Sequence, residues 1–222
     1  MKNLKTKLWI LLIVSFVLIA LAVFLTAGTI YYWQGWVFLG VGAFTSFLLT
    51  IYTVKNPILL ENRVGSTKEQ RPIQKIIVLC MALSGIALIT IPGLDHRFGW
   101  SSMPNWLSIF GDLLIILCMW IVYLTYKENS FGSSTVKIVK NQKVITTGPY
   151  AIVRNPMYSA GMMYFIGLPL ALGSYWGLIP AMLTILGLVW RLSEEEKFLV
   201  KNLPGYKEYC SKIHWHLMPW IY

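Results

Sequence analysis

Residues 8–27, LWILLIVSFVLIALAVFLTA, form a run without a single charged side chain. An α-helix rises about 1.5 Å per residue, so a run of this length crosses the roughly 30 Å hydrocarbon layer of a bilayer. The run is longer than the apolar core of a secretory signal peptide, which has about 7–15 residues. The sequence that follows, TAGTIYYWQG, is also a poor cleavage site. We therefore predict a membrane-spanning helix that stays in the protein as an anchor.

Working outward from this run, similar apolar stretches occupy residues 36–54, 76–94 and about 105–126. A longer one, 157–190, is interrupted by LGSYWG at 172–177, which predicts a helical hairpin with its turn there. The chain is 56% hydrophobic and 13% charged, unlike an average soluble domain. The expected fold is all-α: a polytopic membrane protein with about six transmembrane helices, including a C-terminal helical hairpin, and a cofactor pocket on the cytoplasmic side.

The basic residues predict the orientation of the chain. All but one of the 19 lysines and arginines lie before the first span or in 55–75, 127–154 and 191–222, which share one face if there are six crossings. The positive-inside rule makes that face cytoplasmic. We therefore expect an integral protein of a prokaryotic inner membrane with both termini in the cytoplasm. An aromatic belt is expected at the opposite interface from Trp33, Trp36, Trp100, Trp106 and Trp176.

Composition also limits the partners. The net charge of +10 is spread over loops beside spans, where membrane lipids are closer than nucleic acid, so no nucleic-acid binding is expected. The three cysteines form no CxxC pattern, and the histidines form no ligand cluster with them. His214 and His216 could hold a metal, but two histidines at i and i+2 near a membrane are more often interfacial. No metal is expected.

The chain divides into residues 1–126, with four N-terminal transmembrane helices, and residues 127–222. The second part contains a basic loop, the hairpin and a charged amphipathic tail that begins WRLSEEEKFL. The loop and the tail flank one hairpin, whose two ends return to the same side. We therefore expect them to meet at the cytoplasmic interface.

Residues 145–161, ITTGPYAIVRNPMYSAG, form the least membrane-like stretch of the second part. Gly148-Pro149 is a turn signal. Asparagine is a strong helix N-cap and proline is favoured at the first helical position, so Asn155 is predicted to cap a helix that starts at Pro156. The positive end of that helix, with Arg154 beside it, predicts a small anion site at the membrane surface.

Arg191 and Glu195 lie four residues apart, on one face of the predicted second hairpin helix. Acidic groups at the C-terminal end of a span oppose the helix dipole, so a cationic partner is expected unless the helix continues well beyond Glu196. The alternative is a solvated helix with an ordinary salt bridge worth about 0.3–0.5 kcal/mol. A zwitterionic ligand with a flat ring would suit these groups together with Tyr150 or Tyr158, and S-adenosyl-L-methionine has these features.

Two stretches, VITTGPYAIVRNPMYSAG and, after the hairpin, EEKFLVKNLPGYKEYCSKIHWHLMP, resemble the isoprenylcysteine carboxyl methyltransferase family of integral membrane enzymes, which is related to the phospholipid methyltransferases. NPILLENR and GLDHRFGW also resemble loops of prokaryotic members. The positions that match the family pattern are Gly148, Pro149, Tyr150, Arg154, Pro156, Tyr158, Gly161, Glu195, Glu196, Tyr206, Tyr209 and Pro219.

The resemblance implies that 127–222 is a methyltransferase core that binds S-adenosyl-L-methionine. The implied cofactor-binding residues are Gln142, Lys143, Val144, Ile145, Tyr150, Asn155, Pro156, Met157, Tyr158, Arg191 and Glu195. Arg154 and Glu196 are the candidate catalytic residues on the substrate side. One departure is that Asn155 replaces the usual histidine and cannot titrate near pH 7.

The function expected from these features is methyl transfer from S-adenosyl-L-methionine to a lipophilic small-molecule or lipid acceptor through a carboxylate, amine or thiol. Two alternatives stay open. One is an NAD(P)H-dependent membrane sterol or enone reductase, whose C-terminal region looks distantly similar. The other is a non-enzymatic membrane scaffold in which these glutamates and arginines make only salt bridges.

Overall fold

The computed structural model describes residues 2–65, 72–131 and 142–219. These residues form helices and no strands, so the all-α prediction is confirmed for the described part of the chain. The elements in chain order are α1 (Lys2–Ala27), α2 (Trp33–Lys55), α3 (Pro57–Leu60), η1 (Glu61–Gly65), α4 (Pro72–Phe98), α5 (Asn105–Glu128), η2 (Gly148–Ala151), α6 (Pro156–Ala171), α7 (Leu178–Asn202) and α8 (Tyr206–Lys212).

Four helices, α1, α2, α4 and α5, are long and apolar enough to cross a membrane. They contain the four predicted N-terminal runs, so the protein is a membrane protein. The predicted hairpin is also present, because α6 ends at Ala171 and α7 starts at Leu178. Its helices differ from the other four: α6 has only 16 residues, and α7 carries Arg191 and three glutamates within its 25 residues. That these two helices complete six crossings stays a prediction, as does the domain division at residue 126.

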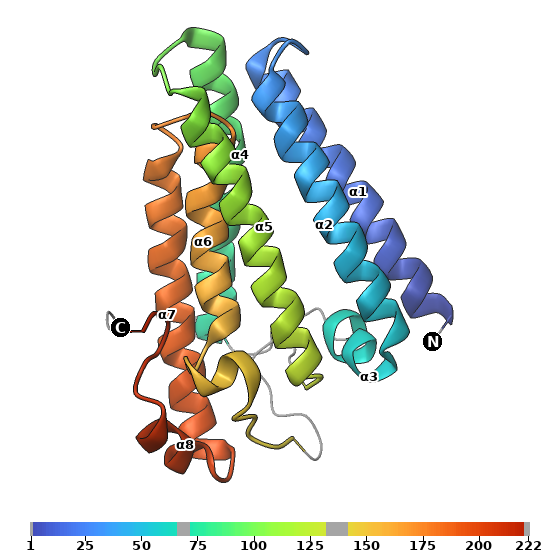
Figure 1. Cartoon of the computed structure of the whole chain (residues 1–222), viewed down its shortest axis with the longest axis vertical. Coiled ribbons are helices and arrows are strands. Elements are labelled where there is room, and N and C mark those ends of the chain that lie inside the picture. Colours follow the sequence, from blue (N-terminus) through green and yellow to red (C-terminus); the bar gives the residue numbers. More distant parts are fainter. Residues whose placement is uncertain (1, 66–71, 132–141, 220–222) are drawn as a thin grey trace.

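The helices form an elongated bundle with two different ends (Figure 1). The α1–α2, α4–α5 and α6–α7 connections lie at the upper end in this view, whereas the N-terminus, α3, the segment before α6 and α8 lie at the lower end. The described parts of the four basic segments therefore share the lower end. The five tryptophans expected in the aromatic belt belong to the starts of α2 and α5 and to the α4–α5 and α6–α7 connections, and each is at least 40% exposed.

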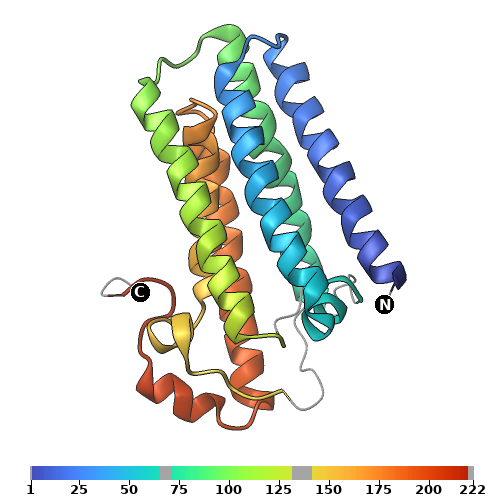
Figure 2. The same cartoon turned by 45° about the vertical axis from the view of Figure 1, so that its right-hand side comes forward.

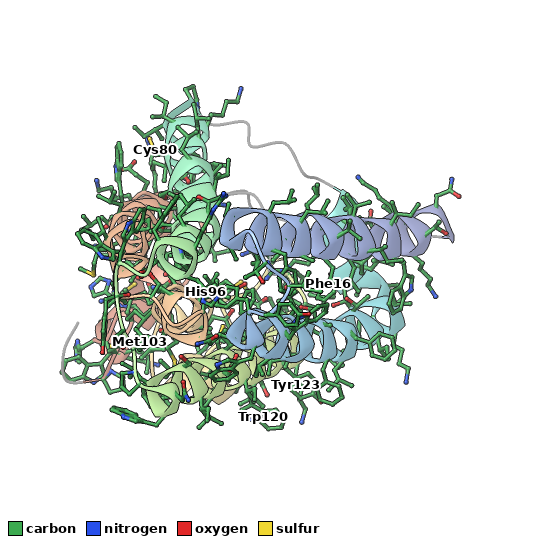
Figure 3. All side chains as sticks on the ribbon, turned by 90° about the horizontal axis from the view of Figure 1, so that it is seen from above. Phe16, Cys80, His96, Met103, Trp120 and Tyr123 are labelled. Carbon is green, nitrogen blue, oxygen red and sulfur yellow. The ribbon has the colours of Figure 1, made fainter. Side chains whose placement is uncertain are left out.

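The hairpin packs on α5 more closely than on any other helix (Figure 2). Gly111 of α5 and Gly167 of α6 face each other at this contact. A Cβ atom on Gly111 would lie 2.7 Å from the carbonyl oxygen of Gly167, and one on Gly167 would lie 2.9 Å from that of Gly111. Small residues let helix backbones approach closely in a membrane. The opposite face of α5 points outward: Trp120 projects from the bundle and is 56% exposed (Figure 3).

Replacing Gly111 with alanine should destabilise the protein, because the added methyl group overlaps the backbone of α6. Forced overpacking of this kind costs about 1–3 kcal/mol. The matched control is Gly40→Ala in α2, where a Cβ atom meets nothing within 4 Å. Thermal unfolding in detergent should show a lower midpoint for Gly111→Ala and an unchanged or slightly higher one for Gly40→Ala. Equal midpoints would contradict the close contact between α5 and α6.

Candidate functional site

A cavity of about 350 Å³ opens at the lower end of the bundle, a size within the usual range for small-molecule sites. Its walls come from η1, α4, the end of α5, the segment before α6, the start of α6, the second half of α7, and α8 with the residues before it. The described residues that line it are Arg63, Met81, Asn129, Phe131, Gln142, Lys143, Val144, Ile145, Tyr150, Arg154, Asn155, Pro156, Met157, Tyr158, Leu188, Arg191, Glu195, Leu199, Leu203, Tyr206 and Tyr209.

The predicted turn at Gly148-Pro149 forms the short helix η2 and fixes Tyr150. Gly148 has a φ of +58°, and a Cβ atom there would lie 2.5 Å from Cγ of Glu128, so both conformation and space favour glycine. The Tyr150 hydroxyl accepts a hydrogen bond from Nδ2 of Asn129 at 2.9 Å. The backbone carbonyl of Tyr150 accepts a hydrogen bond from the Tyr209 hydroxyl at 2.7 Å. The end of α5 and α8 therefore hold Tyr150 against the cavity from two sides.

Helix α6 starts at Pro156, as predicted, but the prediction that the Asn155 side chain caps it is wrong. Nδ2 of Asn155 instead donates a hydrogen bond to Oε1 of Glu196 at 2.7 Å. Glu196 is only 8% exposed, and a buried carboxylate is costly unless donors compensate it. The backbone N–H of Asn155 is also engaged, because it donates to the His216 carbonyl at 3.1 Å. The expected anion site at this helix start therefore has fewer free donors than the sequence indicated.

The three consecutive glutamates of α7 have three different surroundings. Glu195 lines the cavity and accepts a hydrogen bond from the Tyr158 hydroxyl. Glu194 is partly buried and pairs with the exposed Lys197 at 2.8 Å. Glu196 is buried behind the cavity. Because α7 continues to Asn202, these acids lie inside the helix rather than at its C-terminal end, which removes the expected conflict with the helix dipole.

Glu196 accepts from two side chains and faces a third. Besides Asn155, the ring nitrogen Nδ1 of His216 lies 2.8 Å from Oε2 of Glu196. Nη1 of Arg154 lies 3.7 Å from the same oxygen, which is an ion pair but too long for a hydrogen bond. The Arg154 and Glu196 side chains are each 11% exposed. The two candidate catalytic residues are thus neighbours, although only Arg154 lines the cavity.

All eleven residues expected to bind the cofactor line the cavity, although they are far apart in the sequence. Several other residues of the site were not predicted from the sequence. Arg63 comes from the N-terminal half and lies within the NPILLENR stretch, which was the only signal for it. For His216 the sequence pattern indicates at most a metal pair with His214. Nothing in the sequence distinguishes the apolar lining residues of α4 and α7 from the residues of an ordinary membrane span.

Arg63 is held by two unusual contacts. Its guanidinium carbon lies 4.6 Å from the centre of the Tyr126 ring, and its Nη2 atom lies 3.2 Å from the Met157 sulfur. The Nε atoms of Arg63 and Arg154 are buried and have no hydrogen-bond partner among the described residues. Buried donors of this kind are costly unless they are paired. Both arginines can therefore donate to a polar ligand in the cavity.

The described lining is strongly basic: the single carboxylate of Glu195 faces the four cations Arg63, Lys143, Arg154 and Arg191. Burial raises the pKa of the Tyr150 phenol and raises those of Tyr206 and Tyr209 far above their ordinary range. These phenols therefore stay protonated near neutral pH and act as hydrogen-bonding groups, not as bases. Among the described residues, no three His, Cys, Asp or Glu side chains gather where they could hold a metal ion.

A comparison with known protein families supports the resemblance found in the sequence. Residues 106–204 match the family model described as phospholipid methyltransferase. No curated protein matches the chain. The matched region contains α6, α7 and all of α5 except Asn105, and so includes most of the cavity lining.

The match confirms the resemblance to membrane methyltransferases that the GPY and RNPMY stretches indicated, and it covers residues 106–204, fewer than half of the residues of the chain.

Proposed function

We propose that this protein is an integral membrane methyltransferase that transfers a methyl group from S-adenosyl-L-methionine to a lipophilic acceptor. The observation that carries the proposal is the convergence of the 142–158 segment with Arg191 and Glu195 on one cavity, largely within the family match. In this proposal the basic end of the bundle and both termini face the cytoplasm of a prokaryotic cell, since the basic segments gather there.

Each charged or aromatic group of the methyl donor has a suitable partner in the cavity lining. Arg191 and the buried Nε of Arg63 suit its carboxylate, Glu195 suits its ammonium or sulfonium charge, and Tyr150 suits its flat ring. Val144 and Ile145 add apolar surface beside these polar groups. When bound, S-adenosyl-L-methionine supplies a methyl group activated by its sulfonium. The protein then has to hold the acceptor beside that group and keep water out.

Arg154 and Glu196 are assigned to the acceptor side. Arg154 lines the cavity and has a buried donor without a partner, so it can orient a carboxylate or another polar headgroup. Glu196 is withdrawn from the cavity and faces Arg154 at 3.7 Å. Its role is to fix Arg154 electrostatically. A direct role as a base would require it to reach past Asn155, whose amide it already binds.

An apolar cavity supports the lipophilic character of the acceptor. It measures about 510 Å³ and lies between the lower end of α5, η2, the start of α6 and the tail. Its walls include Ile121, Leu124, Met163 and Leu217, and Pro156 borders both cavities. An acyl or isoprenoid chain held here would place its polar head next to Arg154. The adjacency of the two cavities favours a lipid-like acceptor over a soluble one.

The two alternative functions predict different ligands. Heat stabilisation by S-adenosylhomocysteine would support the methyltransferase, whereas stabilisation by NADPH alone would support a reductase. A scaffold would respond to neither compound. The family match favours the first outcome. Incubation with methyl-labelled S-adenosyl-L-methionine and a bacterial lipid extract, followed by identification of the labelled product, tests the function directly.

Glu195→Gln should weaken cofactor binding, because the amide keeps the shape of the side chain but loses its negative charge. Loss of a hydrogen bond to a charged group costs about 1.5–3 kcal/mol, or roughly 10- to 150-fold in affinity. Glu194→Gln is the matched control, since Glu194 lies on the same helix, pairs with the exposed Lys197 and does not line the cavity. Calorimetry with S-adenosylhomocysteine in detergent measures both variants. Unchanged affinity in Glu195→Gln would remove this assignment.

Leu124→Trp should fill the apolar cavity and lower methyl transfer to a lipid extract by about tenfold, while the affinity for S-adenosylhomocysteine stays within about twofold. Leu117→Trp serves as the control, because Leu117 lies on the same helix and is 45% exposed on its outer surface. Radiolabel transfer and calorimetry give the two readouts. Equal activity in both variants would show that the acceptor does not use this cavity.

A further inference from the structure

The tail after α8 returns along the start of α6, and it lies beyond the end of the family match at residue 204. The backbone N–H of Arg154 donates to the Trp215 carbonyl at 2.9 Å. The Ser159 hydroxyl donates to the Leu217 carbonyl at 2.6 Å. Both cartoon views show the tail, coloured red, running back past the segment that precedes α6 (Figures 1 and 2). These bonds bring the side chain of His216 to the site.

The ring of His216 bridges the two residues assigned to the acceptor side. Its Nε2 atom lies 2.7 Å from Nη2 of Arg154, and its Nδ1 atom lies 2.8 Å from Oε2 of Glu196. A guanidinium has donors and no acceptor, so Nε2 must accept the hydrogen bond from Arg154. The ring proton is then on Nδ1 and is donated to Glu196. The geometry thus requires a neutral imidazole in one tautomer.

This bridge is the shortest link between Arg154 and Glu196. Their direct separation of 3.7 Å leaves room for the guanidinium to turn, whereas the imidazole contacts both groups at hydrogen-bonding distance. The His214 carbonyl accepts from the same Nη2 atom at 2.9 Å. The tail therefore holds the guanidinium at Nη2, and Nε of Arg154 is left without a hydrogen-bond partner among the described residues.

We propose that His216 is a positioning residue for methyl transfer, and that its imidazole fixes the orientation of Arg154 relative to the bound acceptor. The proposal rests on the function proposed above. It assigns part of the site to a segment outside the family match. His216 does not line the cavity, so it acts through Arg154 and does not touch the reacting atoms.

Three substitutions separate the two arms of the bridge. In His216→Gln the amide oxygen can reach the place of Nε2 and accept from Arg154. In His216→Asn the shorter amide can take the place of Nδ1 and donate to Glu196, so the Arg154 arm is lost. His216→Phe keeps a ring but loses both arms. His214→Asn is the matched control, because His214 is exposed and only its backbone carbonyl binds Arg154.

The readouts are methyl transfer from labelled S-adenosyl-L-methionine to a bacterial lipid extract, affinity for S-adenosylhomocysteine, and the thermal midpoint in detergent. We expect kcat/KM to fall on the order of 10- to 100-fold in His216→Phe and His216→Asn, as for a misplaced catalytic group. His216→Gln should restore most of the rate, and the affinity for S-adenosylhomocysteine should stay within about twofold throughout. Parallel losses of activity, affinity and midpoint in all three variants, or no loss in His216→Phe, would overturn the proposal.

A second experiment tests the bridge without any enzymatic activity. The chain has only three histidines, so nitrogen NMR of ¹⁵N-histidine-labelled protein gives few signals, and His216→Phe identifies the relevant pair. We expect a neutral ring with its proton on Nδ1 at neutral pH, and loss of this tautomer preference in Arg154→Ala. An imidazolium, or a proton on Nε2, would overturn the bridge. If the bridge is present but no lipid is methylated by the unmodified protein, the proposed function fails instead.

Discussion

The buried carboxylate of Glu196 is the interaction on which the lower end of the molecule depends. A charged group that is almost removed from water costs several kcal/mol unless donors compensate it. Asn155, His216 and Arg154 provide that compensation from the start of α6 and from the tail. One acidic group on α7 therefore fixes three parts of the chain that nothing in the hydrophobic pattern would bring together. The position of Arg154 at the cavity follows from this requirement.

The membrane part of the structure serves the same site through the hairpin. The turn at residues 172–177 returns α7 to the basic end, so Arg191 and Glu195 arrive beside the segment that precedes α6. The glycine contact between α5 and α6 holds the hairpin against a spanning helix. Since lipid offers no hydrophobic drive between helices, close packing and interhelical hydrogen bonds have to provide this attachment. Polar contacts add to this attachment, because the Thr184 hydroxyl of α7 donates to the Ser84 hydroxyl of α4 at 2.8 Å.

Much of this arrangement could be predicted from the sequence. Long uncharged runs predict helices because a bilayer requires internally bonded backbone, and GPY and RNP are local signals for a turn and a helix start. The cavity residues of 142–158 and of α7 followed from spacing and from the family resemblance. Arg63 and His216 could not be found in this way, because they reach the site only through tertiary packing. Asn155 was misassigned because helix capping is a local rule, whereas Glu196 competes for its amide from another helix.

The basic cavity and the apolar cavity suit different parts of a ligand, and Pro156 borders both. The first cavity carries four cations and one carboxylate, and the second is bordered mainly by aliphatic side chains and methionines. A proline at the first turn of a helix has no N–H to satisfy, so it can separate a polar chamber from an apolar one at no hydrogen-bonding cost. An acceptor with a charged head and a long chain would satisfy both chambers together. Neither a small soluble molecule nor a plain hydrocarbon would, and this restricts the proposed acceptor to an amphiphile.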